Sequence, residues 1–326
     1  MNMVVKSLIA AGVLVGATLS AQAGSVSQWN MPTPYPDKTF HTQNIIQFAK
    51  DVTANTNGEL KITVHSAGSL FKHKEIKNAV RSGQVPIGEF FMGLLANENA
   101  AFAIDTQPFL ASNYDDAAKL WSAQRPIVNK LFEKQGLMVL YSVPWPGQSL
   151  YTKKSVTKVS DLAGLKFRSY NATLEKFVKL AGAAPTQVEV PDIAQAFSTG
   201  RVEAMITSPS TGANSKAWDF VNIYTDIQAW VPKNVVVINK KAFAKLDKSV
   251  QDAVLAAAKA AEKRGWEMSM SEASSKIAIL KKNGMTIVTP SDELMKGLRE
   301  IGATMLSDWK KSAGADGETI LNAYNK

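Results

Sequence analysis

Residues 161–211 read DLAGLKFRSYNATLEKFVKLAGAAPTQVEVPDIAQAFSTGRVEAMITSPST. Short apolar runs of strand length alternate here with segments whose apolar residues recur at helical spacing, and Gly182 and Gly200 end the two helical segments. The predicted strand, helix, strand, short helix and strand cover residues 164–168, 174–181, 186–190, 191–199 and 202–206. This alternation predicts α/β structure with a mostly parallel sheet, whose strand ends form a crevice that can hold a ligand.

Arg168 ends the first of these strands, so its side chain is expected at the crevice. A guanidinium is permanently charged and presents a planar fork of donors, which matches a carboxylate with two parallel hydrogen bonds. Ser208, in the polar run after the third strand, is expected at the same edge. The alternative for Arg168 is a surface position or an ion pair between lobes, because most arginines are exposed.

The first 23 residues have the features of a secretory signal peptide. Lys6 gives a positive start, residues 8–19 form an apolar core, and the small residues Ala21 and Ala23 mark a cleavage site after Ala23. No other apolar run reaches the roughly 18 residues needed to cross a bilayer. We therefore expect an exported, soluble, periplasmic protein.

The composition and motifs exclude several classes of function. The sequence has no cysteine, which excludes disulfides, thiolate metal sites and a cysteine nucleophile. The formal net charge is +9, but the lysines are scattered and no arginine-rich tract occurs, so nucleic-acid binding is not expected. His41, His65 and His73 lack the spacing of a metal pair, and no phosphate-binding loop or serine-nucleophile motif occurs. We expect no metal site and no cofactor.

An enzyme remains an alternative, because two carboxylates that are far apart in the sequence can meet in the fold. That alternative is a periplasmic hydrolase or lyase. A structural or adhesive protein is disfavoured, because the sequence has neither repeats nor low-complexity tracts.

The chain is expected to cross between two lobes near residues 145–148, where WPGQ interrupts an apolar strand with residues that restrict or free the backbone. Residues 249–283 have a helical pattern that would extend about 50 Å at 1.5 Å per residue, long enough to span both lobes. The predicted segments are a first lobe at 24–144 plus 233–248, a second lobe at 145–232, the spanning helix at 249–283, and a C-terminal segment at 284–326 that packs mainly on the second lobe.

Six short motifs occur in order along the mature chain, namely GELKI (58–62), SGQV (82–85), QPFL (107–110), GLKFR (164–168), GAAP (182–185) and AFSTGRVEA (196–204). Together they resemble the extracytoplasmic substrate-binding proteins of TRAP transporters. The resemblance implies a two-lobed periplasmic-binding-protein fold of the Venus flytrap type, with a long helix across both lobes. It also implies that the protein closes on a small organic carboxylate and delivers it to a membrane permease driven by an ion gradient. We expect the binding protein itself to be a monomer.

The resemblance also assigns a role to Arg168, because in most members of that family an arginine at this position pairs with a ligand carboxylate. The sequence departs from the family at two positions. Gln148 stands where many members have a second arginine, which suggests fewer or differently placed anionic groups on the ligand. Ser208 stands where members usually have an asparagine before a proline, which removes one amide contact.

Further ligand-binding candidates fall near positions that line the cleft in the family. Flat apolar walls, suited to an aromatic or branched group, are expected from Phe91, Trp145, Trp218 and Trp230, with ordinary core packing as the alternative for the tryptophans. Phe40 is expected to face the cleft from the first lobe. Glu89 interrupts an apolar strand, so it either accepts a hydrogen bond from the ligand or caps a backbone group in its own lobe. Tyr151 and Asn171 are candidates for polar contacts, with solvated loop positions as the alternative.

Overall fold

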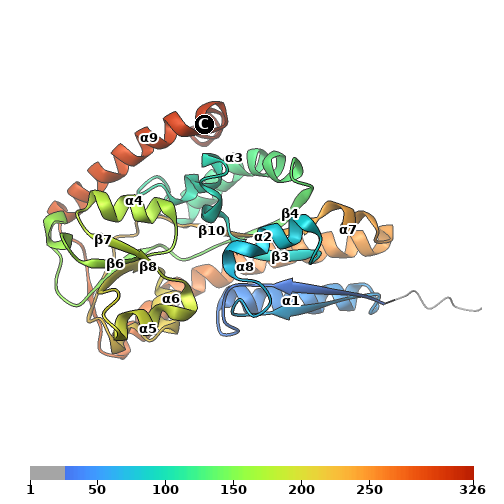
Figure 1. Cartoon of the computed structure of the whole chain (residues 1–326), viewed down its shortest axis with the longest axis horizontal. Helices are drawn as coiled ribbons and strands as arrows, with labels where there is room; N and C mark the ends of the chain where they lie inside the picture. The colour runs from blue at the N-terminus through green and yellow to red at the C-terminus, as the bar shows by residue number, and fades with distance from the viewer. Residues whose placement is uncertain (1–25) are drawn as a thin grey trace, which may run out of the picture.

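The computed structural model describes residues 26–326, so the predicted signal peptide lies outside the described part of the chain. The described residues form two lobes that lie side by side, each with helices packed around β-sheet (Figure 1). We call lobe I the one that contains the first strand, at Ser27, and lobe II the one that contains Arg168. The two-lobed α/β architecture expected from the sequence is confirmed.

Lobe I contains a parallel pair of strands and an antiparallel three-stranded sheet. The parallel pair consists of β1 (Ser27–Pro32) and β2 (Leu60–His65), and the three-stranded sheet has the order β3 (Ile87–Phe91), β10 (Lys233–Asn239), β4 (Leu137–Pro144). The helices of this lobe are α1 (Phe40–Asn55), α2 (His73–Ser82), η1 (Met92–Leu95), η2 (Ala100–Thr106), α3 (Tyr114–Glu133) and α7 (Lys240–Ala244).

The strand directions in lobe I differ from the mostly parallel sheet that the sequence predicted. β10 runs antiparallel to both β3 and β4. Strands β3 and β4 end at the junction between the lobes, whereas β10 begins there because the chain returns from lobe II. All seven residues of β10 are buried, as a central strand requires.

Lobe II is organised around a six-stranded mixed sheet. β6 pairs in parallel with β7 and β8, as the alternating strand and helix pattern predicted, whereas β5 pairs antiparallel with β8 and β9. In sheet order the strands are β11 (Thr286–Val288), β9 (Ile223–Thr225), β5 (Ser149–Thr152), β8 (Ala204–Thr207), β6 (Lys166–Ser169) and β7 (Ala184–Gln187). The helices are η3 (Val159–Leu162), α4 (Ala172–Leu180), η4 (Val190–Asp192), α5 (Ile193–Ser198), α6 (Pro209–Asn214) and η5 (Ala217–Asp219).

Two extended segments, residues 145–148 and 226–232, cross between the lobes and bind each other. The Trp145 N–H donates to the Pro232 carbonyl at 2.8 Å, and the Gln148 N–H donates to the Trp230 carbonyl at 3.0 Å. The Ala229 N–H returns a bond to the Gln148 carbonyl at 2.8 Å. The predicted crossing at residues 145–148 is therefore paired with a second crossing, residues 226–232. The cleft between the lobes opens beside the two segments.

Gly147 lies where the two crossing segments approach each other closely. A Cβ at this position would lie 1.7 Å from the side-chain oxygen of Gln228, so a larger residue here would force the Gln228 side chain to move. Gln228 itself has a positive φ of 43°, a conformation that is uncommon for residues other than glycine. The crossing is thus a tightly packed and locally strained part of the backbone.

Helix α8 (Lys248–Lys282) is the third connection and contains 35 residues. It packs against α1 and β4 in lobe I and against α6 in lobe II. The spanning helix predicted over residues 249–283 is therefore present with nearly the same ends. Its close contact with β4 depends on Gly265, where a Cβ would lie 2.4 Å from a methyl group of Val143.

Helix α9 (Asp292–Tyr324) lies above both lobes and ends near α3 (Figure 1). Leu294, Leu298 and Met305 join a core of lobe II, whereas Trp309 and Ile320 pack with residues of η2 and α3 in lobe I. The C-terminal segment thus packs on both lobes, whereas the sequence predicted packing mainly on the second. The reason is that the apolar side of α9 continues to Trp309 and Ile320, which pack against lobe I.

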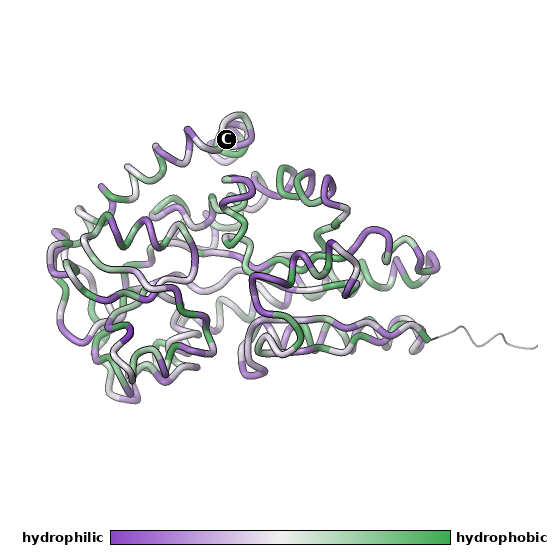
Figure 2. The backbone as a smooth tube through the Cα atoms, in the orientation of Figure 1, coloured by the Kyte–Doolittle hydropathy of each residue, from purple (hydrophilic) through white to green (hydrophobic). Residues whose placement is uncertain are grey.

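Apolar and polar residues alternate along the helices (Figure 2). Within residues 26–326, no helix combines the length and the hydrophobicity needed to cross a membrane.

Candidate ligand-binding site

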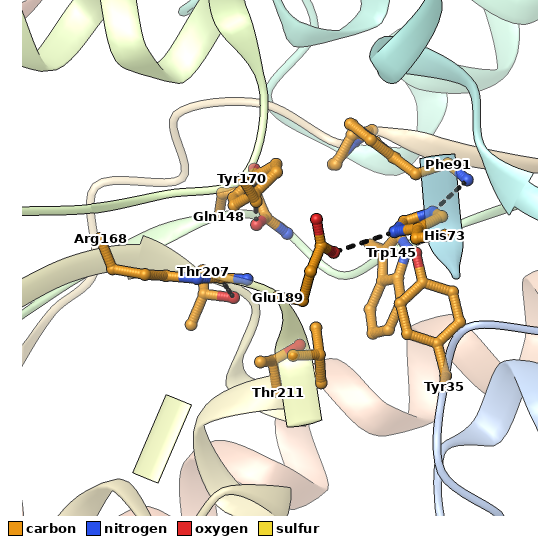
Figure 3. Close-up of a pocket in the computed structure, with 12 residues that line it drawn as sticks. Tyr35, His73, Phe91, Trp145, Gln148, Arg168, Tyr170, Glu189, Thr207 and Thr211 are labelled. Atoms are coloured by element: carbon orange, nitrogen blue, oxygen red, sulfur yellow. Dashed lines mark hydrogen bonds and ion pairs between the residues drawn. The ribbon is translucent and has the colours of Figure 1, made fainter. Parts of the chain in front are cut away.

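A cavity lies between the lobes, beside the crossing segments (Figure 3). The space between its lining atoms, including the open solvent at its mouth, is about 400 Å³. Four aromatic rings and a small number of polar groups form its wall. The lining residues are Tyr35, His73, Phe91, Trp145, Gln148, Arg168, Tyr170, Glu189, Val190, Thr207, Thr211 and Pro232.

Arg168 reaches the cavity from β6, and its neighbours on the flanking strands fix its direction. Its Nε donates to the Val188 carbonyl at 3.0 Å, and its Nη1 lies 3.5 Å from the hydroxyl oxygen of Thr207, at the end of β8. The guanidinium carbon lies 4.9 Å from the centre of the Tyr170 ring, a cation–π contact. The side chain is held in one orientation before any ligand binds.

The Arg168 charge has no ionic partner in the described structure. Arg168 is 1% exposed, yet within residues 26–326 no carboxylate oxygen lies within 4.0 Å of the guanidinium nitrogens of Arg168. Burial lowers the pKa of Arg168 to about 10, so the group still carries its charge at neutral pH. A buried charge without a counter-ion is costly, and an anionic ligand would remove that cost.

Glu189 and His73 form a hydrogen bond across the cleft. Glu189 follows β7 in lobe II, and its Oε2 lies 3.1 Å from Nδ1 of His73, the first residue of α2 in lobe I. The Phe91 N–H donates to Nε2 of His73 at 3.1 Å, which leaves Nδ1 as the protonated nitrogen that donates to Glu189. This bond links the lobes at the wall of the cavity.

The Glu189 carboxyl is held in its ionised form. Burial alone would raise the pKa of this group, but the hydrogen bond from His73 and the charge of Arg168 bring the pKa below its usual value. The cavity therefore contains both a cation and an anion, which are not in direct contact.

The aromatic wall is fixed by contacts behind it. The Nε1 of Trp145 donates to Oδ1 of Asn234 at 2.9 Å, and the Tyr35 hydroxyl donates to the same oxygen at 3.3 Å. The Tyr35 and Trp145 rings meet edge to face with centres 5.0 Å apart, and Phe91 and Tyr170 meet likewise at 5.6 Å across the cleft. These rings form flat, preformed surfaces for a small ring or branched group.

The structure brings together four of the residues proposed from the sequence, namely Phe91, Trp145, Gln148 and Arg168. Gln148 is 3% exposed and already bonded inside the protein. Its Nε2 donates to the Pro146 carbonyl at 2.8 Å, and its Oε1 accepts from the Tyr170 hydroxyl at 3.1 Å. The neutral amide thus contributes to the wall without adding a second cation.

Glu89 and Phe40 lie behind the wall and not on it. Glu89 is 2% exposed, accepts from the Thr33 hydroxyl at 2.6 Å and from Nδ2 of Asn234 at 2.9 Å, and lies 3.2 Å from Nδ1 of His41. Phe40 packs edge to face on Trp145, with ring centres 5.5 Å apart. Glu89 is thus bonded to three side chains of its own lobe, and not to the cavity or to a backbone group as the sequence suggested. It orients Asn234 and through it the aromatic wall.

Asn171 and Ser208 serve as helix caps and do not line the cavity. The Asn171 side chain accepts from the Leu174 N–H at 2.9 Å at the start of α4. The Ser208 side chain accepts from the Thr211 N–H at 3.0 Å at the start of α6. Short polar side chains before a helix satisfy its free N–H groups, so both residues have a local role.

Tyr151, Trp218 and Trp230 belong to the packing of lobe II. The buried Tyr151 hydroxyl donates to the Ser208 carbonyl at 3.1 Å, and Trp218 is half-buried against a core of the lobe. Trp230 is buried, and its Nε1 donates to the Tyr170 hydroxyl at 3.1 Å. Trp230 therefore supports a lining residue without itself reaching the cavity.

Eight lining residues were not among the ligand-binding candidates, namely Tyr35, His73, Tyr170, Glu189, Val190, Thr207, Thr211 and Pro232. Thr207 and Thr211 belong to the polar run 207–211, which the sequence placed at the crevice, and the rule that ligands bind at strand ends could also have found Tyr170 and Glu189. Tyr35 and His73 approach from lobe I, and no local pattern indicates that they face the cleft.

The sequence matches the profile of bacterial extracellular solute-binding proteins, family 7, over residues 33–312. The chain belongs to this family. Its fold is that of TRAP solute-binding proteins. DctP6 and DctP7 of Bordetella pertussis, extracytoplasmic solute receptors binding pyroglutamic acid, are 43% and 45% identical to it, and both have a TM-score of 0.91. The matches cover 92% of this chain and 99% and 100% of those chains.

A third solved structure is a marine metagenome TRAP solute-binding protein specific for pyroglutamate, with co-purified pyroglutamate. It is 42% identical, covers 92% of this chain and 99% of its own, and has a TM-score of 0.90. The proteins of this family, including the three with solved structures, are periplasmic receptors that bind small organic acids. None of these comparisons supports the hydrolase or lyase alternative.

Proposed function

We propose that this TRAP solute-binding protein captures pyroglutamate in the cavity at Arg168 and delivers it to its membrane permease. The observation that carries the proposal is the buried Arg168 guanidinium, which is aimed into the cavity and lacks an ionic partner within residues 26–326. A ligand carboxylate would supply that partner through two charge-assisted bonds. The flat ring of pyroglutamate suits the walls formed by Tyr35, Trp145, Phe91 and Tyr170.

The ligand would hold the lobes together, because the cavity takes its wall from both. Arg168, Tyr170 and Glu189 come from lobe II, and His73 and Phe91 come from lobe I. A ligand that contacts both lobes favours the closed state by its higher affinity for that state. We further propose that the protein acts as a monomer in the periplasm after cleavage behind Ala23, and that the closed form is the one the permease recognises.

The test is a thermal-shift measurement on mature protein that has been unfolded and refolded to remove captured ligand. A free ligand concentration of about a thousand times Kd adds roughly 4 kcal/mol to the free energy of unfolding. This increase raises Tm by several degrees in a protein of this size. We expect that rise with pyroglutamate and a much smaller one with compact dicarboxylates such as succinate, since Gln148 offers no second cation. No rise with pyroglutamate, or a larger rise with the dicarboxylate, would contradict the proposal.

A further inference from the structure

Glu189 places a carboxylate inside a cavity that we propose binds an anion. Figure 3 shows this carboxylate standing among the lining residues, with one oxygen directed to His73 and the other directed away from it. The second oxygen, Oε1, has a long contact of 3.4 Å with Nε2 of Gln187. The Glu189 side chain is 33% exposed, so it is accessible from the cavity. Such a group would weaken the binding of an acid unless it contacts a different part of the ligand.

The chemistry of an ionised carboxylate defines what that part must be. Both oxygens can only accept hydrogen bonds, and His73 already occupies Oε2. A ligand atom that faces Oε1 must therefore be a donor. A ligand carbonyl, ether oxygen or second carboxylate at this position would place lone pairs against a negative charge.

We propose that Glu189 is a specificity-determining residue, which accepts a hydrogen bond from an N–H next to the carboxylate that Arg168 binds. The inference rests on the proposed function and deepens it. In pyroglutamate the ring N–H and the carboxylate are attached to the same carbon atom. Arg168 and Glu189 are near enough for each charge to affect the other, yet they form no ion pair. One small ligand with an adjacent donor and carboxylate can bridge them.

His73 is a positioning residue for this contact. It binds one Glu189 oxygen and is itself held by the Phe91 N–H of lobe I. The ligand N–H would thus be bound by Glu189, a side chain of lobe II that is hydrogen-bonded to lobe I through His73. We infer that ligand recognition and lobe closure are coupled at this residue pair.

The inference predicts discrimination against the lactone isostere of pyroglutamate, 5-oxotetrahydrofuran-2-carboxylate, in which oxygen replaces the ring N–H. Sites built to bind a donor reject analogues without it by a factor of about 10⁴ to 10⁵ in the strongest cases. Glu189 is one-third exposed, so water can compensate part of the loss. We expect a preference of about a hundred-fold for the lactam.

Calorimetric titration of refolded mature protein with the two ligands tests this. In Glu189→Gln the charge is lost and the amide can donate to the ring oxygen, so the preference should fall to about ten-fold or less. Glu300→Gln removes the same charge from an exposed position on α9 and should keep the hundred-fold preference. His73→Leu should also reduce the ratio, whereas a purely structural defect would weaken both ligands equally.

The inference is overturned if wild-type protein binds the lactone within about three-fold of pyroglutamate. It is also overturned if Glu189→Gln keeps the full preference. A wild-type protein that binds no pyroglutamate at all would overturn the proposed function, and this inference with it. The first two results leave the proposed function intact, so the two failures are distinguishable.

Discussion

Arg168→Ala is expected to weaken pyroglutamate binding by about 2 to 5 kcal/mol, roughly thirty-fold to several thousand-fold in Kd. The variant removes the fully buried cation and leaves the ligand carboxylate desolvated without a partner. Arg168→Lys keeps a positive charge but lacks the planar fork that Val188 and Thr207 orient, so it should also bind weakly.

Calorimetry on refolded protein measures this effect, with Tm recorded for each variant to verify folding. The matched control is Arg299→Ala, which removes the same charge from an exposed position on α9 and should leave Kd unchanged. If Arg168→Ala bound pyroglutamate within about three-fold of the wild type, the carboxylate would not be held by Arg168.

The second large effect concerns the buried pair of Asp105 and Lys233, which lies where β10 leaves the crossing segment. Both side chains are fully buried, with Nζ of Lys233 3.7 Å from Oδ2 of Asp105. The same oxygen accepts from the Lys233 backbone N–H at 2.9 Å. Asp105→Asn can keep the backbone bond but leaves the lysine without a counter-ion. We expect the free energy of unfolding to fall by about 3 to 5 kcal/mol.

The double variant Asp105→Asn with Lys233→Met provides the control. Methionine removes the buried charge and fills a similar volume, so most of the lost stability should return. Denaturant unfolding of the ligand-free protein measures both variants. An Asp105→Asn protein that loses less than about 1 kcal/mol would show that the pair contributes little, and a double variant as unstable as the single one would show that the charge is not the cause.

The same pair sets a dependence of stability on pH. Burial raises the pKa of Asp105 from 3.8 to about 6, despite the opposing effect of Lys233. The folded protein therefore binds this proton more tightly than the unfolded chain does. The resulting contribution to stability is complete below about pH 4 and is lost as the pH rises through 6. In Asp105→Asn this component should be absent from the pH profile.

Much of the fold could be predicted because its signals are local. The apolar spacing around Arg168 predicted β6 and α4, and the uninterrupted helical pattern from residue 249 predicted α8 to within one residue at each end. The direction of β10 could not be predicted in this way. It depends on the chain returning from lobe II, and the apolar run of that strand has the same appearance in either direction.

The site was predictable on one side of the cleft only. Arg168 was found because it ends a strand of lobe II and because a family resemblance pointed to it. His73 begins a helix in lobe I, and its approach to Glu189 depends on how the lobes meet. Glu89 was a candidate because a carboxylate in an apolar strand needs a partner. That partner, Asn234, lies 145 residues away in the chain, and no local pattern indicates the contact.

The central claim is that a small carboxylate binds against Arg168 in the cavity between the lobes. A crystal structure of the refolded mature protein with added pyroglutamate tests it most directly. We expect one ligand in this cavity, with both carboxylate oxygens about 2.7 to 2.9 Å from guanidinium nitrogens of Arg168 and with the ring N–H donating to Glu189. A ligand whose carboxylate faces any other group, or a cavity that stays without ligand at saturating concentration, would contradict it.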